Sequence, residues 1–357
     1  LYRFVSEAPI EDPSDPANSR LFEAGRREVA RFRPDGGGEW LALAPETAVD
    51  PQRPGYFAAF GVKQATLLPH SDRTRAGAQR FDQDRAVETY RISFPCLGDL
   101  YAGAGERRMG AILIDAHLAA NAIGATATAR PEDTVIDPGS GDLLIAFTAG
   151  GGDSDGHADP AIFRGPGGEV SWPYGWIMRL EEDEPAQAGR DRGSPPSRDR
   201  FRWRMVAVGG PPWQGGLGFS NPDNLAVDRG GNVWVVTDRS TRAAALNVFG
   251  NNSCWVLPRD ASGDGTALCF AIGPMECELT GPCFDDREHT LFLSVQHPGE
   301  NHGARVLKDG SPEVTKQTHT LVDREGKPFE QRREVPVGSN WPSGVPGRTP
   351  RPAIVAI

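Results

Sequence analysis

Three stretches of the chain share one alternation of apolar and polar positions. Each has a short apolar strand, a turn led by an aspartate, and a second strand of β-branched or aromatic residues, which is typical of a hairpin inside a propeller blade. The copies read PEDTVID and DLLIAFT from Pro131, PDNLAVD and NVWVVT from Pro222, and TGPCFD and TLFLSV from Thr280. This repeat predicts a series of antiparallel sheets.

The remaining pattern adds strands, one helix and two loops. Strand-like runs at residues 1–6, 28–33 and 40–43 predict an incomplete blade, and residues 111–122 have an apolar face at helical spacing. Gly, Asp and Pro dominate residues 149–168, and charge and Pro dominate residues 181–200. Such compositions predict two flexible surface insertions that do not pack.

Composition and charge narrow the fold class and the partners. With 43 Gly and 31 Pro, the 357 residues are typical of strands and turns, and 38% hydrophobic content is enough for a core. We therefore expect an all-β fold, a single β-propeller domain over residues 1–357 with a few short helices and long loops. A net charge of −10 argues against nucleic acid, and no apolar run approaches the roughly 20 residues of a membrane span.

The cysteines and the first residues suggest further expectations. Five cysteines form no Cys-x-x-Cys pair and leave an odd thiol, which favours buried free thiols over a disulfide framework. The chain opens on strand-like residues without an initiator methionine. We expect that it begins inside a fold and lacks an N-terminal portion.

Acidic and amide side chains at the strand starts are the main chemical signal. Glu132, Asp223 and Glu278 would fall on different blades, and the inner strands of a propeller direct their ends toward one channel. Gathered there, like charges would raise one another's pKa values unless a cation neutralised them. Their carboxylates and the Asn224 amide are hard oxygen donors that suit Ca²⁺, with Fe³⁺ also possible. The alternative is that strand-end acids only cap turns, as we expect for Asp137 and Asp228.

Two neighbouring elements strengthen the hypothesis of a site. Arg130 precedes Glu132, and a guanidinium there suits a bidentate grip on phosphate or carboxylate. Polar residues 296–300, from Gln296 to Glu300, follow an apolar strand at a predicted propeller mouth. The alternatives are a surface salt bridge for Arg130 and a tight turn for residues 297–300.

At these residues the chain resembles the PhoX-type bacterial alkaline phosphatases. The matching signatures are LAANAIGAT with RPED within residues 118–133, DNLA with GNVW from Asp223, GNN from Gly250, ELTGP from Glu278, QHPGE from Gln296, and WP at Trp341. The resemblance runs along nearly the whole chain and covers the middle and C-terminal part of the family. The family's N-terminal part, with a cysteine iron ligand, has no counterpart here.

This resemblance implies a function and a location. It implies a six-bladed propeller, incomplete here, which is exported folded by the twin-arginine route to the periplasm or outside the cell. Its channel would hold Fe³⁺ and Ca²⁺ and hydrolyse small phosphomonoesters, and we expect a monomer. By motif, Glu132 would be a metal ligand and Arg130 the catalytic contact to phosphate. Asp223, Asn224 and Glu278 match motifs that we place at the metal site.

Two other functions remain open from the sequence. The run from Asn221 to Asp228, followed by Gly-Asn-Val-Trp, also resembles the blade motif of calcium-dependent sugar lactonases. A non-catalytic propeller that keeps the scaffold for binding is the third possibility.

Overall fold

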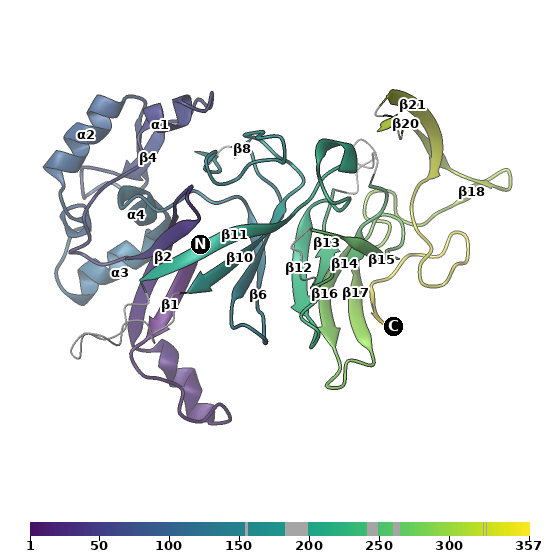
Figure 1. Ribbon diagram of the computed structural model, residues 1–357, viewed down its shortest axis with the longest axis horizontal. Helices are drawn as coiled ribbons and strands as arrows, with labels where there is room; N and C mark the ends of the chain where they lie inside the picture. The colour runs from purple at the N-terminus through teal and green to yellow at the C-terminus, as the bar shows by residue number, and fades with distance from the viewer. Residues whose placement is uncertain (154–155, 183–198, 241–248, 260–264, 324, 326) are drawn as a thin grey trace. The chain divides into compact units, whose positions relative to one another are not determined.

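The computed structural model describes residues 1–357 except 154–155, 183–198, 241–248, 260–264, 324 and 326. Strands dominate, with a few short helices, as Figure 1 shows, so the predicted all-β, propeller-like fold class is confirmed. Contacts divide the chain into two compact units. The first unit comprises Leu1–Thr128, Gly152–Phe163 and Glu182–Trp203, and the second Ala129–Gly151, Arg164–Glu181 and Arg204–Ile357.

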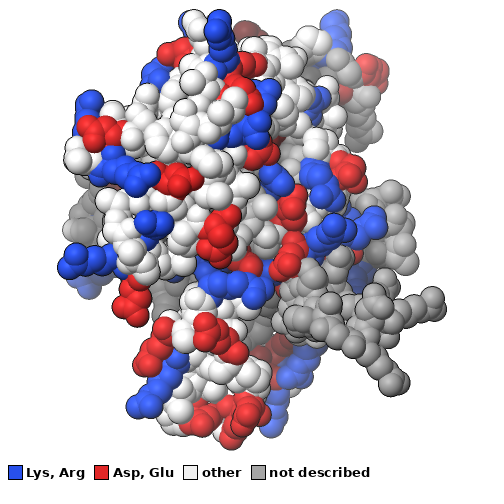
Figure 2. Space-filling model, turned by 90° about the vertical axis from the view of Figure 1, so that its left-hand side faces the viewer, with Lys and Arg blue, Asp and Glu red and all other residues white. Residues whose placement is uncertain are grey.

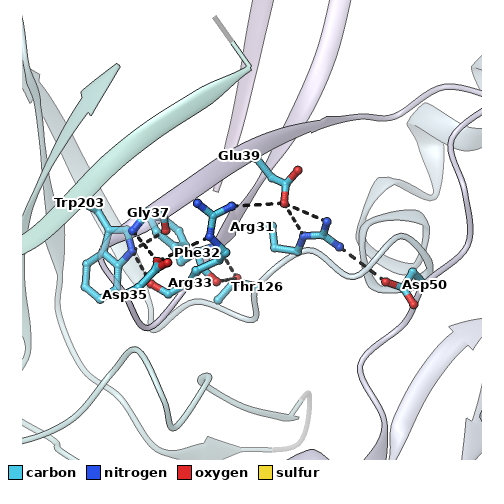
Figure 3. Close-up of polar contacts among 9 residues, drawn as sticks. All are labelled: Arg31, Phe32, Arg33, Asp35, Gly37, Glu39, Asp50, Thr126 and Trp203. Atoms are coloured by element: carbon cyan, nitrogen blue, oxygen red, sulfur yellow. Dashed lines mark hydrogen bonds and ion pairs between the residues drawn. The ribbon is translucent and has the colours of Figure 1, made fainter. Parts of the chain in front are cut away.

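The first unit contains an antiparallel sheet that confirms the strands predicted at 1–6, 28–33 and 40–43. Its strands are β1 (Tyr2–Ser6), β2 (Gly25–Phe32), β3 (Gly37–Ala42) and the beginning of β11 (Arg200–Val208). Val29 of β2 pairs with Tyr2 and with Leu41. Beside the turn between β2 and β3, the Trp203 indole donates to the carbonyl oxygens of Arg33 and Gly37, both at 3.0 Å (Figure 3).

The first unit also contains helices and a hydrophobic core that includes Val87, Tyr90 and Ile112. The helices are η1 (Pro16–Phe22), α1 (Pro54–Ala58), α2 (Asp84–Ser93), η2 (Leu97–Asp99), α3 (Glu106–Ile114) and α4 (Ala116–Ala122), beside the hairpin of β4 (Thr66–Pro69) and β5 (Ala78–Phe81). The single helix predicted at 111–122 is in fact two helices. Asp115 separates them, and its carboxylate accepts a 2.7 Å hydrogen bond from the Tyr101 hydroxyl.

The structure corrects the prediction that residues 149–168 do not pack. After the short strands β8 (Gly152–Asp153) and β9 (Gly156–His157), Ile162 and Phe163 are buried, and Asp159 accepts from the Tyr56 hydroxyl at 2.8 Å. Apolar residues at the end of a Gly-rich stretch are enough to anchor it. The second predicted insertion, 181–200, lies mostly at 183–198, outside the described residues.

Each copy of the sequence repeat forms the inner hairpin of a sheet in the second unit. The hairpins are β6 (Pro131–Ile136) with β7 (Leu143–Phe147), β12 (Pro222–Val227) with β13 (Val233–Thr237), and β16 (Glu278–Phe284) with β17 (Leu291–Gln296). The predicted hairpins are confirmed. β12 lies against β6 on one side and β16 on the other.

Further strands extend these three sheets outward. β10 (Trp176–Glu182) and the end of β11 extend the first, β14 (Ser253–Leu257) and β15 (Leu268–Ile272) the second, and β22 (Ala353–Ala356) the third. Small two-stranded sheets pair β18 (Leu307–Lys308) with β19 (Ser311–Pro312) and β20 (Val314–Val322) with β21 (Pro328–Pro336), and η4 spans Pro212–Gln214. Apolar side chains such as Leu144, Leu225 and Val235 fill the space between the first two sheets.

Side chains join the inner strands at β-bulges. The pairing of each inner strand shifts register, between Pro131 and Asp133, between Pro222 and Leu225, and between Thr280 and Cys283. Asp133 Oδ2 accepts from the Leu225 amide at 2.8 Å. In the next strand, Asn224 Oδ1 accepts from the Gly281 amide at 2.9 Å and from the Thr280 hydroxyl. The second residue of each Glu-Asp or Asp-Asn pair therefore links its bulge to the bulge of the next sheet.

Removing this link should destabilise the second unit. Asp133→Ala would leave the Leu225 amide without its acceptor, and an orphaned buried donor costs about 1–3 kcal/mol. Asp133→Asn keeps an oxygen acceptor and should lose much less. Urea unfolding of both variants measures the difference. Equal losses for Ala and Asn would contradict the assigned hydrogen bond.

Asp137 and Asp228 cap turns, as the sequence predicts. Asp137 Oδ1 accepts from the Gly139 amide at 2.9 Å and its other oxygen from Arg179 at 2.8 Å. Asp228 accepts from the Asn232 amide and from the Trp234 indole, both at 2.9 Å. The hydrogen bonds of these two acids therefore stabilise the turns of their hairpins.

The prediction of buried free thiols is confirmed only in part. All five are free, and Cys254 and Cys277 are buried, but Cys269 and Cys283 are exposed. Cys269 lies on β15, which has no buried residue, and Cys283 lies at an exposed position of β16 next to the buried Pro282.

Candidate functional site

A polar cavity of about 450 Å³ lies in the second unit, where the inner strands begin. Its lining residues are Arg130, Glu132, Thr148, Asn221, Asp238, Ser240, Glu300 and Asn301. A larger cavity of about 570 Å³ lies in the first unit among residues such as Arg31, Asp50 and Tyr56, and none of the predicted site residues lines it. Of the predicted site residues, Arg130 and Glu132 line the smaller cavity, whereas Asp223, Asn224 and Glu278 are not among its lining residues.

Backbone pairing and the first bulge place Arg130 and Glu132. The Arg130 amide donates to the Ala149 carbonyl at 3.1 Å, and the Thr148 amide donates to the Arg130 carbonyl at 2.9 Å. Arg130 thus continues the ladder between β6 and β7. Its guanidinium lies 3.1 Å from Glu132 Oε1 and its side chain is 70% exposed. The ion pair named as an alternative for Arg130 is present, and it leaves most of the guanidinium open to solvent.

Asp223 has the strongest electrostatic perturbation among the predicted ligands. Burial and the negative charges of Glu278, Asp238, Glu132 and Asp133 raise its pKa from 3.8 to about 7. A carboxyl group with this pKa is partly protonated at neutral pH. The charges of Glu132 and Glu278, which belong to two other hairpins, therefore both act on Asp223.

Glu278 is held by the segment that follows β17. Its Oε2 accepts from Gln296 Nε2 at 2.8 Å and lies 3.2 Å from His297 Nε2. Burial and Asp238 raise the Glu278 pKa, and His297 and Gln296 oppose that rise. Residues 296–300 thus contact the acidic cluster as well as turning the chain.

His297 has a strained backbone and a buried polar atom. Its φ of 31° is a conformation that residues other than glycine rarely adopt. Its Nδ1 is buried without a hydrogen-bond partner and lies 3.9 Å from Glu300 Oε2. A strained residue with an unsatisfied nitrogen beside carboxylates is typical of a functional site.

Sequence reasoning missed Asp238 and Asn221. Burial and Glu300 raise the Asp238 pKa, while His297 and Arg130 lower it. The Asp238 amide donates to the Asn221 carbonyl at 3.0 Å, and Asn221 Nδ2 donates to the Thr148 carbonyl at 2.9 Å. The sequence could have indicated Asp238 by its position, because this residue directly follows the last residue of a strand of the repeat.

The structure gives Asn224 a role other than the predicted one. Its Oδ1 already accepts the two hydrogen bonds from the third hairpin, so the oxygen proposed for a metal is committed to the sheet linkage. Within the described ranges, no three His, Cys, Asp or Glu side chains form a group that could hold a metal ion. The acids are electrostatically coupled without forming a closed cage.

The surface charges agree with the acidic composition. On the face in Figure 2, acidic and basic side chains are interspersed with uncharged ones, and its described residues form no continuous basic area. Among the described helices, none combines the length and the apolar character that crossing a bilayer requires.

The chain can be assigned to a known family. The family described as "Alkaline phosphatase PhoX" matches residues 1–299, and the chain belongs to that family. No protein with a curated description matches the chain by sequence.

A solved structure extends the likeness over the whole chain. The structure of Pseudomonas fluorescens PhoX in complex with vanadate, a transition state analogue, matches 99% of this chain with a TM-score of 0.60 and 24% identity. This chain spans 48% of that protein's chain. A gluconolactonase of Xanthomonas campestris matches 60% of this chain and 79% of its own at 15% identity, with a TM-score of 0.25. The second likeness has no bearing on the lactonase alternative.

Proposed function

We propose that the second unit contributes to the metal-dependent hydrolysis of phosphomonoesters. The observation that carries the proposal is that a solvent-exposed guanidinium, that of Arg130, pairs with Glu132, one of a group of acids whose negative charges raise the pKa of Asp223. Family membership supports it, and so does the vanadate bound by the Pseudomonas relative. Because this chain spans about half of that relative, the activity of the whole protein is part of the proposal.

The donor chemistry of the acids fits hard cations. Glu132, Asp223 and Glu278 offer carboxylate oxygens, and the raised pKa values of Asp223 and Glu278 mean that a positive charge there would be favourable. Since these three do not form a metal-holding group by themselves within the described residues, we propose that they supply part of the ligand set for Ca²⁺ and Fe³⁺, with Asp238 as an additional candidate ligand. Bound cations would supply charge neutralisation for the phosphoryl oxygens and a lower pKa for a bound water.

The chain's own groups position the substrate. Arg130 would bind two phosphoryl oxygens with its fork of N–H donors, a geometry that a lysine cannot reproduce. Glu132, 3.1 Å away, would orient that guanidinium. His297 would hold Glu278 in place through its Nε2 contact of 3.2 Å, which limits the freedom of a carboxylate at the centre of the cluster. The polar lining of the cavity favours small hydrophilic esters over lipids.

The location and assembly state follow the family. We propose export in folded form to the periplasm or beyond, and action as a monomer on a soluble ester, with no nucleic-acid or membrane partner. Folding before export would allow metal to be loaded while the thiols stay reduced in the cytoplasm.

Substitution of Arg130 tests the function. In the full-length gene product, Arg130→Ala should lower kcat/KM for p-nitrophenyl phosphate by about 100-fold, the cost of removing one positioned transition-state donor. Arg130→Lys should recover only part of the loss, because it keeps the charge but not the fork.

The control for this test is another exposed arginine of the same unit. Arg204 pairs with Glu181 at 3.7 Å and does not line the cavity, so Arg204→Ala should leave kcat/KM unchanged. Unaltered turnover in Arg130→Ala would overturn the role of Arg130. A wild-type protein that hydrolyses lactones and no phosphate ester would overturn the proposed function.

A further inference from the structure

We propose that Glu276 is a positioning residue that fixes residues 297–303, the loop that carries Glu300 and Asn301 into the cavity lining. This role rests on the proposed function for its catalytic consequence, but its geometry stands independently. Glu276 is 2% exposed and does not line the cavity. It therefore acts through the loop and touches no reacting atom.

Both carboxylate oxygens of Glu276 are fully used by this loop and one neighbouring segment. Oε2 accepts from the backbone amides of Asn301 at 3.1 Å and His302 at 3.0 Å. Oε1 lies 2.7 Å from His302 Nδ1 and accepts from the Gly338 amide at 2.9 Å. An acceptor-only group with two lone-pair oxygens matches this convergence of donors.

The backbone of the same residues holds the other end of the loop. The Gly299 amide donates to the Met275 carbonyl at 3.1 Å, and the Glu300 amide donates to the Glu276 carbonyl at 3.2 Å. Glu276 itself has a φ of 55°, an uncommon conformation for a residue with a side chain. Glu276 therefore binds the loop through its backbone carbonyl and through its carboxylate. A shift of the loop would break both the backbone and the side-chain hydrogen bonds.

The same short segment connects the loop to the acidic cluster. Glu278 lies two residues after Glu276, at the start of β16, and its carboxylate contacts His297 at the start of the loop. The intervening Cys277 is buried, and its carbonyl accepts from Asn252 Nδ2 at 2.9 Å. Glu276 therefore links the start of β16, which carries Glu278, to the loop residues Glu300 and Asn301 that line the cavity.

The test compares Glu276→Gln with a matched buried acid. An amide has one acceptor oxygen, so Glu276→Gln would direct an NH₂ group at N–H donors and loosen the loop. Asp137 is also a buried acid of the second unit and also accepts from a backbone amide and from a side chain, but at a hairpin turn. Asp137→Asn should lower thermal stability and leave kcat/KM within threefold.

In Glu276→Gln, we expect kcat for p-nitrophenyl phosphate to fall at least about tenfold, as small misplacement of a site can cause. KM should stay within about threefold, since Arg130 is untouched. Glu276→Asp, which keeps two acceptor oxygens on a shorter stem, should give intermediate kcat and guards against a Gln variant that fails to fold. A Glu276→Gln protein with wild-type kcat, or an equal loss in Asp137→Asn, would overturn the positioning role.

A second measurement does not depend on activity. Hydrogen exchange at the Asn301, His302 and Gly338 amides should be faster in Glu276→Gln and unchanged in Asp137→Asn. If the wild-type protein hydrolyses no phosphate ester, the proposed function fails, while faster exchange still supports the loop anchor. Unchanged exchange in Glu276→Gln would refute the anchor whatever the activity.

Discussion

Asp223→Asn should abolish most phosphomonoester hydrolysis and yet stabilise the metal-free protein at pH 8. The loss follows from removing a proposed cation ligand, worth about 3 kcal/mol of transition-state stabilisation or roughly 100-fold in rate. The gain follows from the Asp223 pKa, which burial and the neighbouring acids raise to about 7. An acid with a raised folded-state pKa loses its proton more easily when unfolded, so its ionisation weakens the fold as pH rises from about 4 through 7.

Thermal unfolding in chelator from pH 5 to pH 8 measures the stability part of this prediction. The melting temperature of Asp223→Asn should exceed that of the wild type by a margin that grows with pH. Asp228→Asn, in the same hairpin, is the control with the opposite sign. Burial raises the Asp228 pKa, but hydrogen bonds from Trp234 and Asn232 outweigh that effect and lower it. Its asparagine variant should lose stability above about pH 4 and keep activity.

A margin for Asp223→Asn that stays constant or shrinks with pH would show that burial and the neighbouring acids do not raise the Asp223 pKa. Wild-type hydrolysis in Asp223→Asn would remove Asp223 from the proposed ligand set, independently of the stability result.

Removing hard cations with a chelator at pH 8 should lower hydrolysis by roughly 100-fold and reduce the melting temperature. Added Ca²⁺ at 100 times its dissociation constant should restore about 2.7 kcal/mol of stability, since a ligand that binds only the folded state stabilises it by mass action. The increment should be smaller at pH 5, because protons compete for Asp223 and Glu278, whose pKa values are raised.

The variants that separate this effect from general ion stabilisation are Glu278→Gln and Asp142→Asn. Glu278→Gln should abolish the Ca²⁺-dependent increment. Asp142 pairs with Arg179 at 2.8 Å in the hairpin turn, so its variant should keep the increment. A melting temperature that responds to neither Ca²⁺ nor Fe³⁺, with unchanged turnover in chelator, would contradict metal dependence.

The strands were predictable because each apolar run has only one way to bury its side chains in a sheet. The electrostatic effect of Glu132 and Glu278 on Asp223 agrees with the sequence pattern for a related reason, since a repeat puts equivalent positions at equivalent places. The different uses of neighbouring polar residues were not. Whether Asp133 and Asn224 face a cation or the next sheet depends on the bulges, which the sequence pattern does not encode.

Other differences between the sequence predictions and the structure involve contacts between residues that are apart in the sequence. At the break between the two helices, the Asp115 carboxylate accepts from the hydroxyl of Tyr101, a residue 14 positions away. The roles of Asp238 and Glu276 depend on the loop after β17. Charged residues of this loop act on the Asp238 pKa, and the His302 amide donates to the Glu276 carboxylate. Tertiary hydrogen bonds decide such positions, and a single sequence carries no record of which donor will arrive.

The side-chain hydrogen bonds that join the bulges of neighbouring sheets all run in the same order along the chain. Asp133 reaches from the first repeat hairpin to the second, and Asn224 from the second to the third, always toward the later part of the chain. During synthesis each carboxylate or amide is ready before the strand it will receive has emerged from the ribosome. Exchanging the middle hairpin would therefore require both of its neighbours to be re-matched, because it receives one link and supplies the other.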